Sequence, residues 1–177
     1  MKTCVFITGT NAVGKTTLAR EIMKRCGGIA DMTKTLTLLA DGKTCFAGRY
    51  GEKSGGVDRM CTGALADVVA EGMKTHDTVF CEGSYLDTFG MNLLNALFKG
   101  DRSMVVNLYA DARTLAARRT GRTGRTGDDM TYVLRKNRRT MLCARKYQSI
   151  GVPVLQFDTG KVETQEIADA VLNALNK

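Results

Sequence analysis

The sequence predicts an α/β protein, with a mostly parallel, five-stranded sheet and helices on both of its faces. Two observations lead to this fold class. Short apolar runs, typical of buried strands, alternate along the 177 residues with longer segments of helical periodicity. This order is typical of a parallel sheet covered by helices. The chain also has a single proline and no linker rich in proline or serine, so residues 1–177 are expected to form one domain.

The predicted elements follow one another in a regular order. Strands are expected at 3–8, 35–40, 44–47, 78–81, 104–109 and 152–158, and helices at 15–26, 58–73, 88–98, 112–119, 131–149 and 163–176. Apolar residues recur in these segments at strand or helix spacing. Asp41-Gly42 is a hairpin turn signal. The segment Thr120–Gly127 combines small residues, glycine and arginine, and is too rich in glycine for a helix.

The composition excludes several classes of protein. Hydrophobic residues make up 44% and charged residues 25% of the chain, as in ordinary globular domains. No apolar run approaches the roughly 20 residues of a membrane span, and the apolar N-terminal run is too short for a signal peptide. We therefore expect a cytoplasmic protein without a membrane partner. Six cysteines without a CxxC pair, and a single histidine, argue against a zinc site.

Positive charge is concentrated in one part of the chain. The formal net charge is +8. Eleven of the 26 Lys and Arg residues, but only two of the 18 Asp and Glu residues, lie between Ala112 and Lys146, so this window carries +9 and the rest of the chain −1. Such a block favours a polyanionic partner or a crowded set of phosphates.

The residues after the first predicted strand form a phosphate-binding motif. They match G-x-x-x-x-G-K-[ST] between a strand and a helix, and they are Gly9, Thr10, Asn11, Ala12, Val13, Gly14, Lys15 and Thr16, followed by Thr17. Such a loop turns backbone N–H groups towards an anion at a helix N-terminus. Lys15 is expected to reach the β- and γ-phosphates of ATP, and Thr16 to offer its hydroxyl to Mg²⁺. The motif therefore predicts a P-loop NTPase fold that binds ATP and Mg²⁺.

Three features favour a kinase over other nucleotide-binding proteins. The chain is short, it lacks the guanine-reading Asn-Lys-x-Asp motif, and an arginine-rich segment at about 118–130 lies where small kinases carry a mobile lid. Arg118, Arg122 and Arg125 are candidates to stabilise the transferring phosphoryl group while the lid excludes water. The alternative for this segment is a solvated loop.

Carboxylates are expected at the sheet edge where ligands bind. Glu82 follows the strand at 78–81 and is a candidate to hold Mg²⁺ or its water; the alternative is a surface glutamate. Asp111 ends a later strand in a comparable way and is instead expected to cap the helix that starts at residue 112.

The segment 48–59 is the candidate acceptor site. It contains four glycines, which allow a loop to approach a ligand closely. Arg49 and Arg59 can bind phosphate, and Tyr50 offers an aromatic face for stacking a base. Asp58 can accept a proton from an attacking hydroxyl. The alternatives are Asp58 as the N-cap of the following helix and Tyr50 as a packing residue.

The chain resembles the bacteriophage 5-hydroxymethyluracil DNA kinases. The resemblance rests on the P-loop, the Gly-Arg-Tyr-Gly…Gly-Gly-Val-Asp-Arg segment, Glu82-Gly83 and the Arg-Arg-x-Gly-Arg lid, and it covers nearly the whole chain. It implies ATP-dependent phosphorylation of 5-hydroxymethyluracil within DNA, in the host cytoplasm. That reaction is a step of thymidine hypermodification that shields the phage genome from restriction. The preferred catalytic base, Asp58, is an inference from the residues, with Glu82 or Asp41 as alternatives.

The predicted helix at 131–149 supplies a basic face for such a partner. Arg135, Lys136, Arg138, Arg139 and Arg145 cover much of its surface beside an apolar stripe. Arg138 and Arg139 are expected to contact phosphates of single- or double-stranded DNA; the alternative is a solvated amphipathic helix. A kinase for a small molecule or a nucleoside monophosphate, and an NTP-driven switch protein, are the competing functions. The oligomeric state is left open.

Overall fold

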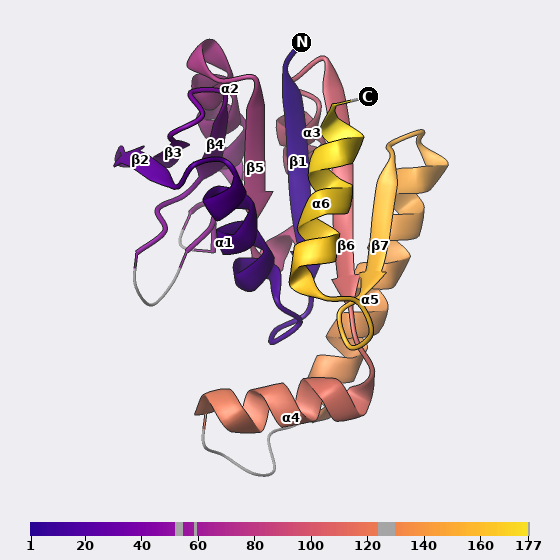
Figure 1. Ribbon diagram of the computed structural model, residues 1–177. Helices are drawn as coiled ribbons and strands as arrows, with labels where there is room; N and C mark the ends of the chain where they lie inside the picture. Colours follow the sequence, from indigo (N-terminus) through magenta and orange to yellow (C-terminus); the bar gives the residue numbers. More distant parts are fainter. Residues whose placement is uncertain (52–54, 59, 124–129, 177) are drawn as a thin grey trace.

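A computed structural model describes residues 1–51, 55–58, 60–123 and 130–176. In these residues seven strands form one sheet, in the order β2-β3-β4-β5-β1-β6-β7 (Figure 1). The strands are β1 (Thr3–Gly9), β2 (Ile29–Met32), β3 (Leu36–Leu39), β4 (Thr44–Ala47), β5 (Thr78–Glu82), β6 (Arg102–Tyr109) and β7 (Val154–Asp158). The prediction of five strands is therefore wrong in number, although the mostly parallel character is confirmed.

The two antiparallel strand pairs lie at one edge of the sheet. Strands β4, β5, β1, β6 and β7 run parallel to one another. Strand β3 pairs with β4, and β2 with β3, in antiparallel fashion. All four residues of β2 are exposed, so the strand lacks the apolar pattern by which a buried strand is recognised. This explains why the sequence did not predict β2.

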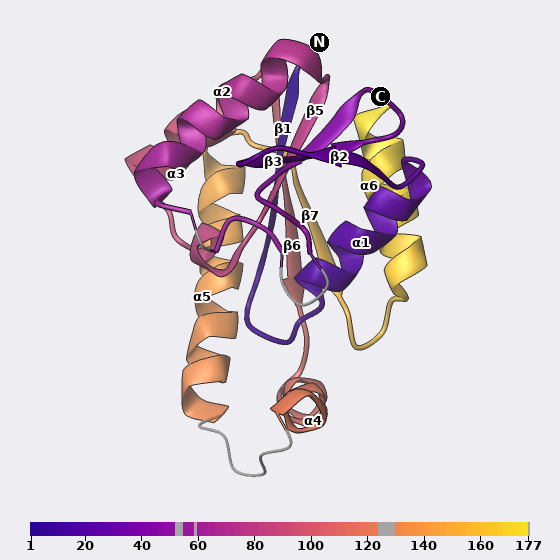
Figure 2. The ribbon, with the colours of Figure 1, turned by 90° about the vertical axis from the view of Figure 1, so that its left-hand side faces the viewer.

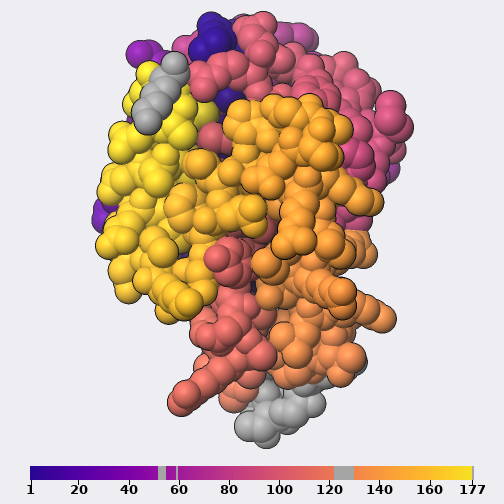
Figure 3. Space-filling model, turned by 90° about the vertical axis from the view of Figure 1, so that its right-hand side faces the viewer, coloured from indigo at the N-terminus to yellow at the C-terminus, as the bar shows by residue number. Residues whose placement is uncertain are grey.

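Helices cover both faces of the sheet, as predicted. Helices α1 (Lys15–Arg25) and α6 (Thr164–Leu175) pack on one face, and α2 (Leu65–Thr75), α3 (Met91–Leu97) and α5 (Met130–Ser149) on the other (Figure 2). Helix α4 (Ala112–Thr123) projects beyond the carboxyl ends of the strands, and in Figure 3 it lies below α6 and beside the lower end of α5. No helix in the described ranges is long and apolar enough to cross a membrane.

Alternating side chains of the central strand build the two halves of the core. In β1, Cys4 and Phe6 belong to the core half that also contains residues of α2, α3 and α5. Val5 and Ile7 belong to the half that contains residues of α1 and α6. Successive residues of a strand point to opposite faces. The run Cys4–Ile7 is therefore fully buried, which is typical of a parallel sheet covered on both sides.

Three predicted helix boundaries are wrong, and one of them is the start of α3, which lies at Met91 and not at residue 88. Helix α2 starts at Leu65, after a short 3₁₀ helix at Thr62–Ala64, and not at Asp58. Helix α4 continues through Gly121 to Thr123, although we had predicted no helix beyond residue 119. One glycine costs a helix only about 1 kcal/mol relative to alanine, and the good helix formers before it carry the helix through.

Other expectations around α4 have mixed outcomes. The Asp111 cap is confirmed, because the carboxylate accepts a hydrogen bond from the Thr114 N–H at 2.7 Å. The predicted lid at 118–130 includes the second half of α4 and the first residue of α5. Its residues 124–129, with the candidate Arg125, lie outside the described residues.

Candidate active site

The phosphate-binding motif forms the turn between β1 and α1, as predicted. A Cβ atom at Gly9 would lie 2.6 Å from the Leu108 carbonyl oxygen and 2.7 Å from Val13 Cγ1, so only glycine fits there. Gly14 precedes α1 with a φ of 103°, a conformation that favours glycine, and Ala12 also has a positive φ of 64°. Such a backbone is strained and is typical of functional loops. The loop leads into the N-terminus of α1, where anions bind.

Lys15 is held inside this loop. Its Nζ donates hydrogen bonds to the carbonyl oxygens of Gly9 at 3.0 Å and Thr10 at 3.1 Å. The side chain is buried, and this burial lowers the pKa of its amine, while the nearby Glu82 carboxylate opposes the shift. A protonated amine has three donors. Two of them have partners in the loop, so the third can reach a phosphate bound there.

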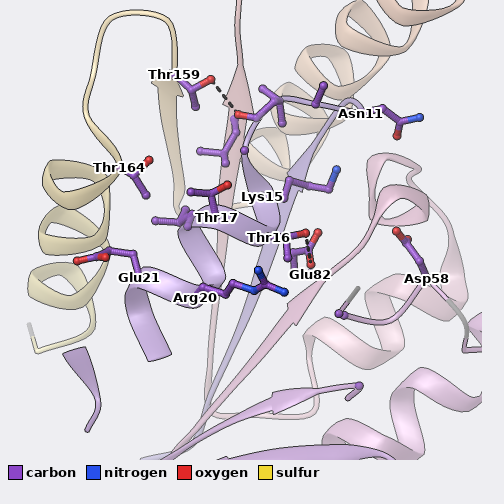
Figure 4. Close-up of a pocket in the computed structure, with 18 of the residues that line it drawn as sticks. Asn11, Lys15, Thr16, Thr17, Arg20, Glu21, Asp58, Glu82, Thr159 and Thr164 are labelled. Carbon is purple, nitrogen blue, oxygen red and sulfur yellow. Dashed lines mark hydrogen bonds between the residues drawn. The ribbon is translucent and has the colours of Figure 1, made fainter. Parts of the chain in front are cut away.

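Thr16 and Glu82 meet below Lys15. The Thr16 hydroxyl donates to Glu82 Oε2 at 3.3 Å, and Figure 4 shows the pair with Lys15 above it and Asp58 to its right. Glu82 is only 2% exposed at the end of β5. Burial raises the pKa of its carboxyl, and the Lys15 charge opposes this shift. Glu82 is thus buried in the site, and the alternative of a surface glutamate is excluded.

The oxygen atoms of Thr16 and Glu82 fit a magnesium site. No cluster of three or more His, Cys, Asp or Glu residues in the described part of the chain could hold a metal ion by itself. Mg²⁺ in nucleotide sites needs only one or two protein oxygens, because phosphates and water complete its coordination. A buried carboxylate beside a hydroxyl, next to a phosphate cradle, is such a donor set.

A cavity of about 1140 Å³ connects these residues to two further regions. It is lined by Arg118, Thr159 and Ile167 and also by Arg49, Gly56, Asp58 and Met60. In Figure 4, Thr159 and Asp58 lie on opposite sides of Lys15, Thr16 and Glu82, and so mark the two ends of the cavity. Sites for one drug-sized ligand measure roughly 300–1,000 Å³. The cavity therefore has room for a nucleotide and for part of a second ligand beyond Glu82.

Arg118 joins the start of the predicted lid to the P-loop. Its guanidinium donates to the Val13 carbonyl oxygen at 3.3 Å, to Thr159 Oγ1 at 2.8 Å and to the Thr159 carbonyl oxygen at 2.6 Å. Arg122 lies one turn further along α4. The sequence did not predict Thr159. Its position directly after β7, at the sheet edge where ligands bind, could have indicated it.

The glycine-rich acceptor segment packs on the end of β5. The Val57 N–H donates to the Glu82 carbonyl oxygen at 2.8 Å. A Cβ at Gly56 would lie 2.1 Å from that oxygen, and one at Gly48 would lie 2.1 Å from the Gly56 carbonyl oxygen. These two glycines are therefore required by close backbone contacts within the protein. They bring the segment against the buried carboxylate.

Asp58 lines the cavity but does not cap a helix. Its Oδ1 accepts hydrogen bonds from the backbone N–H of Ser84 and from the Ser84 hydroxyl, the latter at 2.9 Å. These bonds fix the carboxylate next to the carboxyl end of β5. The alternative base Asp41 does not line the cavity, because its carboxylate binds the N–H groups of Lys43 and Thr44 in the hairpin turn.

The structure contradicts the stacking role predicted for Tyr50. The residue is 3% exposed, and its ring packs edge-on against Phe46, with 5.3 Å between the ring centroids. A Cβ at Gly55 would lie 2.2 Å from the ring, so the backbone covers it closely. Arg49 is exposed at the cavity, whereas Arg59 lies outside the described residues.

The sequence did not predict that a buried carboxylate, Asp87, forms ion pairs with two residues of the basic helix α5. Asp87, 1% exposed, binds Arg139 Nη2 at 3.1 Å and Lys136 Nζ at 3.6 Å. Arg139, one of the two predicted DNA contacts, thus already has an internal partner, although its side chain is 56% exposed. Arg138 is exposed on α5. The two neighbouring arginines therefore differ in their surroundings.

Comparisons with known proteins agree with this fold. A model of the AAA domain family matches residues 5–140. Among solved structures, the tunicamycin resistance protein of Deinococcus radiodurans is similar with a TM-score of 0.62 at 15% identity, over 99% of this chain and 96% of that one. Shikimate kinase from Acinetobacter baumannii, bound to shikimate, has a TM-score of 0.54 at 14% identity, over 99% and 93%.

A third similar structure is deoxyadenosine kinase from M. mycoides with bound dCTP. It has a TM-score of 0.54 at 14% identity, over 98% of each chain. None of the curated protein sequences matches this chain. At such identities the likenesses show the fold alone, and they confirm the predicted P-loop class.

Proposed function

We propose that this chain, which belongs to the AAA domain family, is an ATP-dependent kinase that transfers the γ-phosphate to a hydroxyl group. The single observation that carries this proposal is the continuous cavity. Lys15, Thr16 and Glu82 lie between a nucleotide end and an acceptor end. Two of the three similar structures are kinases by name, and the shikimate kinase was solved in complex with shikimate.

The residues of the P-loop have distinct roles in this proposal. The backbone from Gly9 to Gly14 and the third donor of Lys15 bind the β- and γ-phosphates. Thr16 and Glu82 would hold Mg²⁺, which supplies charge neutralisation on the phosphates when it is bound. Arg118 would stabilise the charge of the transferring group from the start of the lid, and the same role for Arg122 rests on the sequence alone.

Asp58 is the better candidate for the catalytic base. It lines the acceptor end of the cavity, and both hydrogen bonds from Ser84 are accepted by Oδ1. Glu82, in contrast, accepts hydrogen bonds from the Thr16 and Tyr50 hydroxyls and lies beside the phosphate cradle. A carboxylate fixed at the acceptor end can orient a hydroxyl and accept its proton as the phosphate is transferred.

We propose a hydroxymethyl group of 5-hydroxymethyluracil in DNA as the acceptor. The motifs that resemble the phage DNA kinases support this choice, and so does the +9 charge between Ala112 and Lys146. Exposed arginines of α5, among them Arg135 and Arg138, can bind backbone phosphates outside the cavity. In a phage, such a reaction would contribute to a modified genome that resists restriction.

A small-molecule kinase is the second candidate. The names of the neighbouring shikimate and deoxyadenosine kinases favour it, as both describe acceptors that fit inside a cavity. An NTP-driven switch is the least supported function, because it gives no role to the acceptor end of the cavity.

A comparison of acceptors separates these candidates. The protein is incubated with [γ-³²P]ATP and, in parallel, with DNA that contains 5-hydroxymethyluracil, matched thymine DNA, free nucleosides and their monophosphates, and shikimate. We expect label on the 5-hydroxymethyluracil DNA alone. Efficient labelling of a free small molecule would replace the DNA proposal. Release of phosphate with no labelled acceptor would favour the switch.

A further inference from the structure

The hydroxyl of Tyr50 lies at the candidate metal site. It donates a hydrogen bond to Glu82 Oε2 at 3.3 Å, the same oxygen that accepts the Thr16 hydroxyl, also at 3.3 Å. The phenol comes from the acceptor segment, the carboxylate from the end of β5 and the threonine from α1. Three segments that are far apart in the sequence therefore meet at one carboxylate oxygen.

Hydrogen bonds of the backbone and ring contacts hold the Tyr50 side chain in place. Its backbone N–H donates to Thr37 Oγ1 at 3.2 Å, and that hydroxyl donates to the Gly48 carbonyl oxygen at 2.9 Å. The ring lies against Phe46, which stacks on Phe80 with 4.8 Å between the centroids. The phenol is thus fixed by β3, by its own segment and by the core, before any ligand binds.

Glycines bring the acceptor segment into contact with both partners. A Cβ at Gly55 would lie 2.2 Å from the Tyr50 ring, and one at Gly56 would lie 2.7 Å from Glu82 Oε2. Both glycines line the cavity. The backbone that forms the acceptor end therefore covers the phenol and the carboxylate directly, and the three cannot shift independently.

We propose that Tyr50 is a positioning residue that fixes the Glu82 carboxylate for the metal–nucleotide complex and couples it to the acceptor segment. A carboxylate held only by Thr16 could rotate about its side-chain bonds, whereas hydrogen bonds from two sides define its plane. Groups that orient a metal-binding side chain typically change metal affinity about 10- to 100-fold when they are removed. The inference rests on the proposed role of Glu82 at the metal.

The coupling has a consequence for substrate binding. Tyr50 belongs to the same short segment as Arg49, which is exposed at the acceptor end. A change in this segment on acceptor binding would be transmitted to Glu82 through the phenol. Tyr50 thus provides a physical link between the acceptor segment and Glu82.

The test measures metal binding without an acceptor. Binding of Mn²⁺, as a paramagnetic probe, is titrated by electron paramagnetic resonance in the presence of a non-hydrolysable ATP analogue. The variants are Tyr50→Phe and the matched control Tyr147→Phe. Tyr147 is also a buried tyrosine, and it loses a bond of similar length, the one that its hydroxyl donates to the Thr88 carbonyl oxygen at 3.4 Å. Thermal unfolding confirms that each variant is folded.

We expect Tyr50→Phe to weaken Mn²⁺ binding about tenfold and to leave metal-free binding of the ATP analogue unchanged. Tyr147→Phe should bind Mn²⁺ like the wild type. In a Glu82→Gln background, Tyr50→Phe should have little further effect, because the two residues act through one carboxylate. Unchanged Mn²⁺ affinity in Tyr50→Phe, an equal loss in Tyr147→Phe, or full additivity with Glu82→Gln would overturn the inference.

This experiment separates the inference from the proposed function. If DNA is not phosphorylated but Tyr50→Phe still weakens Mn²⁺ binding, the acceptor assignment fails and the positioning role stands. If Glu82→Gln itself binds Mn²⁺ like the wild type, the metal role of Glu82 fails and the inference fails with it.

Discussion

The two ends of the cavity are built in different ways. The nucleotide end adjoins the phosphate-binding loop, which is one continuous run, Gly9–Thr16, with glycines at its close contacts and positive φ angles. The acceptor end is assembled from the segment around Asp58, the end of β5 at Glu82–Ser84 and the adjoining loop. A site in one continuous run is visible in the sequence, whereas a site assembled from several segments becomes visible only in the fold.

Lys15→Ala should cause the largest loss of phosphoryl transfer, because it alters the phosphate-binding loop. We expect transfer to fall about 1000-fold, because the variant loses the charged donor to the transferring phosphate. The melting temperature should stay close to that of the wild type. Burial disfavours the charged form of the Lys15 amine, so its removal should cost the folded state little free energy. Kinase assays and circular dichroism measure both. Lys74→Ala, an exposed lysine on α2, is the control; near-normal turnover in Lys15→Ala would refute the nucleotide site.

Asp58→Asn tests the acceptor end with little change in shape. The amide oxygen of asparagine can still accept the hydrogen bonds from Ser84, but it cannot accept a proton. We expect kcat to fall about 100-fold with an unchanged KM for ATP. Steady-state kinetics with saturating acceptor gives both values. If Asp58→Asn keeps its turnover, the base must be sought elsewhere, with Glu82 as the next candidate.

Asp87→Asn should loosen the helix beside the cavity. The change leaves Lys136 and Arg139 without their buried carboxylate. We expect a loss of about 2 kcal/mol in the free energy of unfolding, below the usual cost for a fully buried pair because Arg139 is partly exposed. Urea unfolding measures the loss. Glu71→Gln, which breaks an exposed pair with Lys74, should cost much less, and equal losses would contradict the account.

Arg138 and Arg139 should separate DNA binding from folding. Arg138→Glu is expected to weaken DNA binding of any sequence and to reduce the salt slope by about one, without a change in stability or in ATP affinity. Arg139→Glu should in addition lower the stability, because its partner Asp87 is buried. Fluorescence anisotropy at several salt concentrations, with unfolding curves, compares the two. Equal stability of the two variants would show that the ion pair between Asp87 and Arg139 does not contribute to folding.

The fold was predictable where local chemistry determines it. The P-loop, the buried runs of β1 and β5 and the cap at Asp111 follow from short-range patterns, and the structure confirms them. The edge strand β2 escaped prediction because its exposed residues carry no apolar signal. Helix α4 extends beyond its predicted end because flanking residues outweigh the cost of Gly121.

The candidate site was predictable in part, for the same physical reason. The sequence identified Lys15, Thr16 and Glu82, because each is tied to a motif or a strand end. It could not determine that Tyr50 is buried against Phe46, or that Asp87 pairs with residues of α5, because these contacts join segments that are distant in the chain. The structure therefore places Tyr50 in the core with its hydroxyl beside Glu82, and not at a surface where a base could stack on it.

The most direct test of the central claim identifies the phosphorylated product. Wild-type protein and Lys15→Ala are incubated with ATP, Mg²⁺ and DNA that contains 5-hydroxymethyluracil, and the DNA is digested and examined by mass spectrometry. The account predicts a nucleoside that carries one additional phosphoryl group on its hydroxymethyl oxygen, formed by the wild type and absent with Lys15→Ala. ATP turnover by the wild type with unmodified nucleosides throughout would contradict it.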